Sequence, residues 1–260
     1  MSAAIPNPNW TAFRTIIRRE VARIVRIWGQ TLVPPAITMT LYFAIFGNLI
    51  GGRIGEMHGM RYIDFIVPGL IMMSVIQSSY GNIVSSFFGS KFQRFIEELL
   101  VSPTPNWVIL TGYVLGAVAR GVMVGAIVLV VAMCFTRIQL HHPLVTLATL
   151  LLTSVMFAFA GFINAVYAKK FDDISIVPTF ILTPLTYLGG VFYSVSLLPP
   201  FWEKVSHLNP VLYMVNAFRY GLLGVSDVPL ATAFAVMVAA TIALGALSMH
   251  LLVTGKGLRA

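Results

Sequence analysis

The chain has 260 residues, of which 58% are hydrophobic and only 10% are charged, and its mean hydropathy is +0.87. These values exclude an ordinary water-soluble globular protein, in which about a quarter of the residues are charged. The formal net charge is +8, but the basic residues fall mostly in short loops between long apolar runs. We therefore expect a polytopic membrane protein, whose positive charge reflects membrane topology and contact with anionic lipids rather than binding of nucleic acid.

The segment 10–28 near the N-terminus has apolar residues at spacings of three and four, which is typical of an amphipathic helix. The apolar stripe consists of Trp10, Phe13, Ile17, Val21, Ile24 and Trp28, and the basic residues on or beside the opposite face are Arg14, Arg18, Arg19, Arg23 and Arg26. We expect this helix to lie in the cytoplasmic membrane interface, with its guanidinium groups among lipid phosphates. The alternative is a solvated helix that docks on protein.

Six apolar stretches are long enough to be membrane spans, and in lipid such spans are helical because the backbone must satisfy its own hydrogen bonds. They cover residues 31–51, 63–88, 110–135, 144–167, 174–192 and 229–253. The region 193–228 is also apolar, but prolines, Asn209 and Arg219 interrupt it, which is typical of interfacial or re-entrant helices. The predicted fold is an all-α membrane protein with six transmembrane helices in one domain, residues 1–260.

The loop between the second and third spans carries a short amphipathic segment, residues 91–101. Its apolar face holds Phe92, Phe95, Ile96, Leu99 and Leu100, and its polar face holds Gln93, Arg94, Glu97 and Glu98. Pro103 and Pro105 then end the predicted helix. Two adjacent carboxylates on the wet face of a cytoplasmic helix suit contact with a soluble partner, although a loop helix with merely solvated charges explains the pattern equally well.

The third span has two Gly-x-x-x-Gly pairs on opposite faces, Gly112 with Gly116 and Gly121 with Gly125. Small residues let neighbouring helices approach closely, so this span is predicted to be internal. The same span contains Arg120, and a central arginine costs about 3 kcal/mol or more in a membrane. Arg120 either contacts an anionic substrate or lipid, or extends its head toward the cytoplasmic interface.

Like Lys204, Arg219 is a cation within the region 193–228. It either lines the outer end of a transport path or pairs with Glu203 or Asp227, and pairing is the reading we favour. Asp172 and Asp173 have no histidine or third carboxylate near them in the sequence, so no metal site is predicted there.

The lysines and arginines divide unequally between the two sides of the membrane. With both termini in the cytoplasm, that side holds eleven and the opposite side five, with Arg120 inside a span. The cytoplasmic set is Arg14, Arg18, Arg19, Arg23, Arg26, Lys91, Arg94, Lys169, Lys170, Lys256 and Arg259, and the outer set is Arg53, Arg61, Arg137, Lys204 and Arg219. This positive-inside asymmetry predicts cytoplasmic termini and an even number of spans.

Two stretches of the sequence resemble a known family. They are the run from Glu97 through Leu99, Leu100 and Val101 to Pro103, and a longer stretch with Phe171, Asp172, Asp173, the run Pro184–Tyr193, Leu198–Pro199, Asn209–Pro210 and Arg219. Both look like the ABC-2 permease family, with the closest similarity to its YadH-like bacterial inner-membrane permeases. The resemblance implies six spans, an N-terminal interfacial helix, re-entrant helices before the last span, and a multi-pass protein of the bacterial inner membrane.

The resemblance also implies a homodimer bound to two copies of an ABC ATPase subunit. The segment 91–101 would be the coupling helix in a cleft of that ATPase, and the cargo would be an exported amphipathic, lipid-like, glycan-linked or drug-like molecule. No Gly-x-x-x-x-Gly-Lys-Ser/Thr loop occurs in the sequence. We therefore expect this chain to bind no cofactor itself and to be no enzyme, with ATP and Mg on the partner subunit.

Two other classes of function stay open at this point. A membrane-embedded transferase acting on lipid would need an acid, a base or a nucleophile that converge at one depth, and no such set is visible in the sequence. An ion-coupled secondary transporter typically needs carboxylates near the middle of the membrane, whereas the nine Asp and Glu residues are predicted to lie in loops or near span ends.

Overall fold

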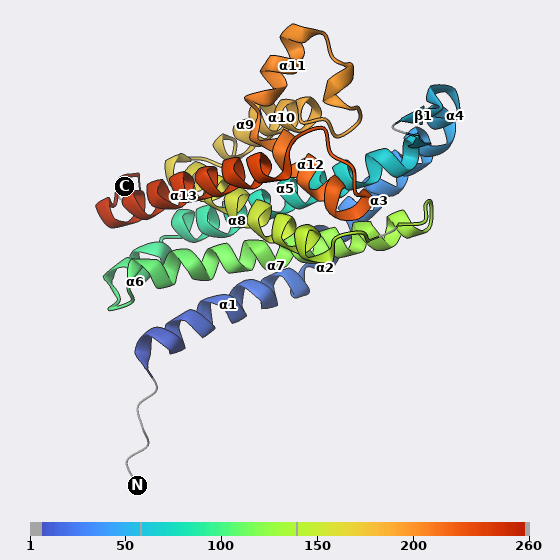
Figure 1. Ribbon diagram of the computed structural model, residues 1–260. Helices are drawn as coiled ribbons and strands as arrows, with labels where there is room; N and C mark the ends of the chain where they lie inside the picture. The colour runs from blue at the N-terminus through green and yellow to red at the C-terminus, as the bar shows by residue number, and fades with distance from the viewer. Residues whose placement is uncertain (1–6, 58, 139, 258–260) are drawn as a thin grey trace.

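The computed structural model describes residues 7–57, 59–138 and 140–257, and this part of the chain is almost entirely helical (Figure 1). The elements of the first half are α1 (Pro8–Arg26), α2 (Trp28–Thr31), α3 (Val33–Tyr42), the π-helix η1 (Phe43–Ile50), α4 (Gly51–Ile54), strands β1 (Glu56–Met57) and β2 (Met60–Arg61), α5 (Tyr62–Phe92), α6 (Phe95–Val101) and α7 (Asn106–Met133). Those of the second half are α8 (Pro143–Tyr167), α9 (Asp173–Val177), the π-helix η2 (Pro178–Leu182), α10 (Thr183–Leu188), the 3-10 helix η3 (Val195–Leu197), α11 (Pro200–His207), α12 (Pro210–Leu223) and α13 (Leu230–Thr254).

Five helical segments of the described chain are long and apolar enough to cross a membrane. They are the composite Trp28–Arg53, which joins α2, α3, η1 and α4, and the single helices α5, α7, α8 and α13. These segments coincide with the predicted spans 31–51, 63–88, 110–135, 144–167 and 229–253. The multi-pass helical architecture predicted from the sequence is therefore confirmed.

The remaining predicted span, 174–192, is shorter in the structure than we expected. An apolar helix covers Asp173–Leu188 and is made of α9, η2 and α10. At 1.5 Å per residue it extends about 24 Å, which is less than the hydrocarbon thickness of roughly 30 Å. The helix ends because Gly190 has a left-handed backbone, with φ of 71°. The count of six spans consequently stays a prediction.

Helix α5 is the central element of the bundle and is buried along most of its length. It packs against α7, α8 and α12, while α13 packs on the outside of α8 and α12 and leaves most of its residues partly or fully exposed. Figure 1 shows α5, α7, α8 and α13 lying side by side, with α6 and the C-terminus at one end and β1 and α4 at the other. Following the predicted orientation, we call the end with α6 the cytoplasmic end.

The two glycine pairs of α7 contact different neighbours, as predicted from the sequence. Gly112 and Gly116 face α1, whereas Gly121 and Gly125 face α5 and α8. The absence of a side chain at these positions lets helices approach α7 on both sides. The prediction that this helix is internal is therefore confirmed.

The region 193–228 contains two short helices, α11 and α12, and neither has the length of a membrane span. Asn209 caps α12 by accepting a hydrogen bond from the backbone N–H of Val211 at 2.9 Å, Pro210 occupies the first turn, and Gly224 ends the helix with φ of 76°. Most of α12 is buried, while α11 projects from the bundle (Figure 1). The structure thus places α12 in the core, and re-entry into the membrane stays a prediction.

The close approach of α5 to the segment after α10 gives a test of the packing. A Cβ atom at Gly69 would lie 2.6 Å from the carbonyl oxygen of Val191, whereas one at Gly81, also in α5, would meet nothing within 4 Å. We expect Gly69→Ala to lower the stability by about 1–3 kcal/mol because backbone must move. Gly81→Ala should leave the thermal midpoint in detergent unchanged or raise it slightly. Equal midpoints for the two variants would contradict this packing.

Candidate functional site

Helix α1 runs along α7 in the same direction at the cytoplasmic end of the bundle (Figure 1). A Cβ atom at Gly112 would come within 2.6 Å of Ile16, and one at Gly116 within 2.6 Å of the Cβ atom of Glu20. Because these contacts advance together along both helices, α1 is parallel to α7. Over these turns α1 therefore docks on protein, and its placement in the membrane interface stays a prediction.

The carboxylate of Glu20 is the centre of the contact between α1 and the bundle, since only 1% of this residue is exposed. Ser86 of α5 donates its hydroxyl to the carboxylate at 2.7 Å, and Arg23 lies 3.1 Å from the same group. Arg23 also donates to the side-chain oxygen of Asn82 at 2.9 Å. A buried carboxylate is tolerated when it is paired and hydrogen-bonded in this way.

Arg19 extends the network from α1 to α7. Its guanidinium donates to the phenol oxygen of Tyr113 at 2.6 Å and lies 3.4 Å from Glu20. Tyr113 in turn donates to the hydroxyl of Ser90 on α5 at 3.0 Å. The side chains of three helices are thus joined into one polar network inside an otherwise apolar bundle.

These contacts correct the predicted roles of the faces of α1. Arg19 and Arg23 bind protein groups rather than lipid phosphates, and the buried stripe is formed by Ile16, Glu20 and Ile24. Trp10 and Trp28 of the predicted apolar stripe are each 61% exposed on the protein surface, so their predicted contact with lipid stays a prediction. The remaining cations of the helix are exposed and stay candidates for lipid contact: Arg14, Arg18 and Arg26.

Sequence reasoning missed Glu20, although two signals point to it. It lies four residues after Ile16 and four before Ile24, so it shares their face. The opposing face of α7 carries Gly112 and Gly116, which leave room for a side chain. The predicted faces of the segment 10–28 did not include Glu20.

The segment 91–101 is not one continuous helix, which corrects the boundaries that we predicted. Helix α5 continues to Phe92, and α6 begins at Phe95. Between them Arg94 has φ of 64°, the only positive φ of a non-glycine residue in the described chain. This left-handed backbone ends α5 and turns α6 against it, at a cost on the order of 1 kcal/mol or more.

The predicted apolar face of α6 is divided between the core and the surface. Ile96 is buried, and Leu99 and Leu100 pack partly against the same cluster of α5, α7 and α8 residues. Phe95 is 52% exposed, and Glu97 and Glu98 are exposed beside it. The helix therefore presents an aromatic ring and two carboxylates to the outside while one isoleucine fixes it to the bundle.

Phe92 and Lys91 connect the end of α5 to the loop between α8 and α9. Phe92 packs edge-on against Phe171, with ring centroids 4.8 Å apart, and is 56% exposed. Lys91 donates to the carbonyl oxygen of Ala168 at 2.9 Å at the end of α8. In the same loop the backbone N–H groups of Lys169 and Lys170 donate to Asp173 and lower the pKa of its carboxyl group.

Arg120 lies in the middle of α7, beside a polar pocket between α3, α5 and α7. Its Nε atom is buried and has no hydrogen-bond partner within the described part of the chain. The described part of the chain thus provides no ion pair for Arg120. Both expected alternatives, contact with an anionic ligand and extension to the interface, stay open.

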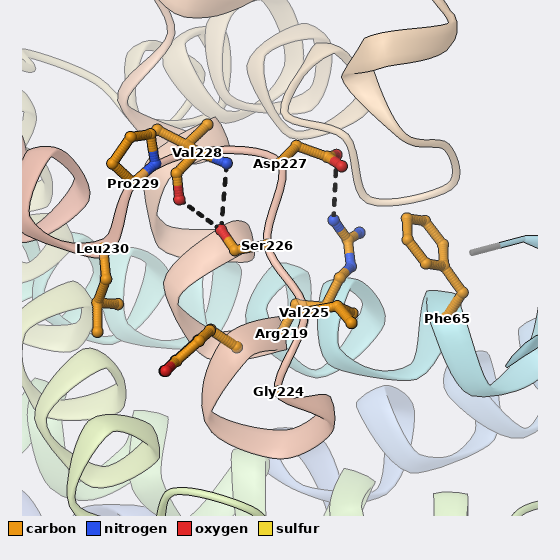
Figure 2. Close-up of a pocket in the computed structure, with 10 residues that line it drawn as sticks. Phe65, Arg219, Gly224, Val225, Ser226, Asp227, Val228, Pro229 and Leu230 are labelled. Atoms are coloured by element: carbon orange, nitrogen blue, oxygen red, sulfur yellow. Dashed lines mark hydrogen bonds and ion pairs between the residues drawn. The ribbon is translucent and has the colours of Figure 1, made fainter. Parts of the chain in front are cut away.

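Arg219 is buried to 1% exposure and connects three segments at the outer end (Figure 2). It donates to the carbonyl oxygen of Gly190 at 2.7 Å, lies 3.9 Å from a carboxylate oxygen of Asp227, and stacks 3.9 Å from the ring centroid of Phe65. Asp227 also accepts from the hydroxyl of Ser194 at 2.9 Å. The favoured pairing of Arg219 with Asp227 is confirmed.

A pocket of about 630 Å³ lies beside this arginine and is lined mainly by residues 224–230. Figure 2 shows Arg219 pointing toward Asp227. Within the same loop, two hydrogen bonds join the hydroxyl of Ser226 to the backbone of Val228. The charges at this pocket already compensate one another. Within the described ranges no group of three or more His, Cys, Asp or Glu residues could hold a metal ion.

Comparison with known proteins identifies the class to which this bundle belongs. The family model described as ABC-2 type transporter matches residues 11–223, from α1 to the end of α12. The chain therefore belongs to the ABC-2 type transporter family. This makes it a multi-pass transmembrane component of an ABC transporter, which associates with an ABC ATPase partner.

Individual relatives make the assignment narrower. The chain is 60% identical over 250 residues to the inner membrane transport permease YadH of Escherichia coli K12, an alignment that covers 96% of this chain and 98% of the relative. It is 27% identical over 227 residues to nodulation protein J of Sinorhizobium fredii, with 85% of each chain covered. The similarity to YadH supports a location in the inner membrane.

Replacement of Glu20 tests whether the polar network holds α1 in place. Glu20→Ala leaves Arg23 partly buried without its carboxylate, so we expect a loss of about 3 kcal/mol, measured as a lower thermal midpoint of the purified protein. Glu98→Ala removes an exposed carboxylate and serves as the matched control. A midpoint that stays unchanged in both variants would show that the network adds no net stability.

A second test concerns the charge pair at the outer end. Arg219→Leu leaves the carboxylate of Asp227 buried without its cation, and we expect a loss of about 2–4 kcal/mol in thermal unfolding. Arg137→Leu, at an exposed outer arginine, should have little effect. Adding Asp227→Asn to Arg219→Leu should restore part of the loss. Purely additive losses in the double variant would contradict the pairing.

Proposed function

We propose that the chain forms a homodimer that binds two copies of a separate ATPase subunit and exports an amphipathic molecule from the cytoplasm or inner leaflet across the inner membrane. The family supports an ABC transporter component. The observation that carries the finer proposal is α6, a short helix that stands at the cytoplasmic end with an exposed ring and two exposed carboxylates. The cargo of the proposed transporter is lipid-like, glycan-linked or drug-like.

Energy for transport comes from the partner in this proposal. The sequence has no phosphate-binding loop of the Gly-x-x-x-x-Gly-Lys-Ser/Thr type, so ATP and Mg are assigned to the ATPase subunit. The permease then has to receive a conformational signal through contact, which requires a surface that binds one state of the ATPase better than another. An exposed helix fixed to the bundle by a buried residue meets this requirement.

The chemistry of α6 suits a basic cleft on the ATPase. Glu97 and Glu98 supply the negative charge, Phe95 supplies an aromatic anchor, and Ile96 links the helix to the core. Phe92 and Arg94 are exposed at the junction with α5 and extend the same surface. Any displacement of α6 acts directly on α5, because only two residues separate the two helices.

The orientation with both termini in the cytoplasm is also part of the proposal. It is supported by the exposed arginines of α1, which would lie near the anionic lipid surface. The same orientation places α6 on the side where ATP is available. It also explains why the basic residues are concentrated at one end of the bundle.

The transferase and ion-coupled alternatives gain no support from the described residues. Glu20 is a buried carboxylate between helices, but its two oxygens already interact with Ser86 and Arg23. A carboxylate that is compensated in this way serves packing rather than proton or ion exchange. The export proposal therefore needs no catalytic group from this chain.

The acidic pair of α6 provides the test of this function. The tagged protein is purified from its native membrane together with the ATPase that accompanies it, and hydrolysis is measured after reconstitution. We expect replacement of both Glu97 and Glu98 by alanine to lower hydrolysis or co-purification at least about fivefold, because two charged contacts of roughly 0.5–1 kcal/mol each are lost. Glu56→Ala, at an exposed residue of the opposite end, is the control.

Normal hydrolysis and normal recovery of the ATPase with the double variant would contradict the role of the acidic pair. A purified permease that transports cargo without any ATPase would contradict the proposed function as a whole.

A further inference from the structure

A second pocket, of about 280 Å³, lies between the start of the first span and the central helices. Its walls come from α2 and α3 on one side and from α5 and α7 on the other, and Arg120 of α7 lines it. The polar groups around it include Gln30, Thr38, Ser74, Gln77 and Ser78. This is a high density of polar side chains for a pocket at the surface of an apolar bundle, and the α6 mechanism does not use it.

The guanidinium of Arg120 has no internal counter-charge. It forms no hydrogen bond or ion pair with any residue that the structure describes, and its Nε atom is buried. The charge that acts on it within that part of the chain is a like charge, that of Arg23 on α1. A partly buried cation without a partner is unfavourable in a membrane protein, and such residues commonly mark a ligand site.

Gln77 is the second unusual group of this pocket. From Phe65 to Tyr80 every residue of α5 is buried except Gln77, which is exposed. The central helix therefore reaches the outside over this stretch at the wall of the pocket that contains Arg120. The Gln77 amide and the Ser78 hydroxyl have no hydrogen-bond partner among the described residues, so both can donate to a ligand.

The pocket beside Arg219 shows what a compensated arginine looks like in this protein. There the cation has a carboxylate at 3.9 Å, a carbonyl oxygen at 2.7 Å and an aromatic ring. Arg120 has no equivalent of any of these contacts in the described chain. The contrast favours an external ligand at Arg120 over a purely structural role.

We propose that the Arg120 pocket binds a phosphate group, and that the cargo is an amphipathic molecule with such a head. This deepens the proposed function by naming the class of its substrate, and it rests on that function only for the step of transport. Arginine binds phosphate through a planar fork of N–H donors, and the Gln77 amide and Ser78 hydroxyl add neutral donors. The phosphate supplies the negative counter-charge that Arg120 lacks among the described residues.

The size and surroundings of the pocket fit the head of such a molecule rather than the whole. Sites that enclose a drug-sized ligand have volumes of about 300–1,000 Å³, so 280 Å³ leaves the apolar part outside. Ile37 and Leu41 of α3 are each 57% exposed and flank Thr38 at the pocket wall. Their apolar surface is available to a hydrocarbon chain that extends from a bound head.

The test measures binding to the purified permease without its ATPase, so that its result does not depend on the export function. The probes are dihexanoyl phosphatidic acid, dihexanoyl phosphatidylcholine and inorganic phosphate, titrated by calorimetry in a neutral detergent. We expect phosphatidic acid to bind the natural protein and Arg120→Gln to bind it at least about tenfold more weakly, which corresponds to 1.4 kcal/mol. Gln77→Leu should weaken binding by a smaller factor.

Arg137→Gln, which removes an exposed arginine near the outer end of α7, is the matched control and should bind like the natural protein. Inorganic phosphate distinguishes the sources of the ligand. Binding of phosphatidic acid but not of inorganic phosphate assigns the site to a lipid-like head, whereas binding of both assigns it to phosphate itself.

Several outcomes would overturn the proposal. They are equal binding of phosphatidic acid to the natural protein and to Arg120→Gln, equal loss in the Arg137→Gln control, and absence of binding of both phosphatidic acid and inorganic phosphate. If Arg120→Gln does not fold, Arg120→Lys and Gln77→Leu decide the question. Lysine keeps the charge but lacks the fork, so weaker binding in both variants supports the site and unchanged binding refutes it.

Discussion

The buried ion pair between Glu20 and Arg23 determines where the N-terminal part of the protein can lie. A carboxylate inside a helix bundle is stable only with partners, and here Arg23 and the hydroxyl of Ser86 provide them. This requirement holds α1 against α5 and α7. Since α2 and α3 follow α1 directly, the same contact also sets the position of the helices that form one wall of the Arg120 pocket.

Three residues of α5 lie near charged side chains at three successive levels of the protein. Near the cytoplasmic end Ser86 satisfies Glu20, and near the outer end Phe65 stacks on Arg219. Between them Gln77 stands at a pocket whose cation has no partner in the described chain. The charged groups at the two ends are therefore compensated within the protein. At the middle level, a bound anion can compensate the charge of Arg120.

The sequence predicts the parts of this structure that depend on composition and length. Helices α5, α7, α8 and α13 follow from long apolar runs, and the contact between Arg219 and Asp227 follows from opposite charges in a region poor in other charges. The break at Arg94 has no such local signal, because the left-handed position that ends a helix is usually occupied by glycine. The burial of Glu20 is only partly signalled within α1, by its spacing from Ile16 and Ile24, because it also depends on the room that Gly116 leaves on α7.

The geometry links the proposed ATPase-binding surface to the proposed cargo site through a single helix. Phe92 and Gln77 belong to the same uninterrupted α5, and fifteen residues correspond to about 22 Å along its axis. A displacement of α6 reaches α5 directly, and the Glu20 network joins α1 to α5 through Ser86 and Asn82 and to α7 through Tyr113. The pocket wall formed by α2 and α3 is continuous with α1, whereas Arg120 belongs to α7. Rotation of α5 against α7 would therefore change the distance between Gln77 and Arg120 in the pocket, which is the differential contact that the proposed coupling between ATP hydrolysis and cargo release requires.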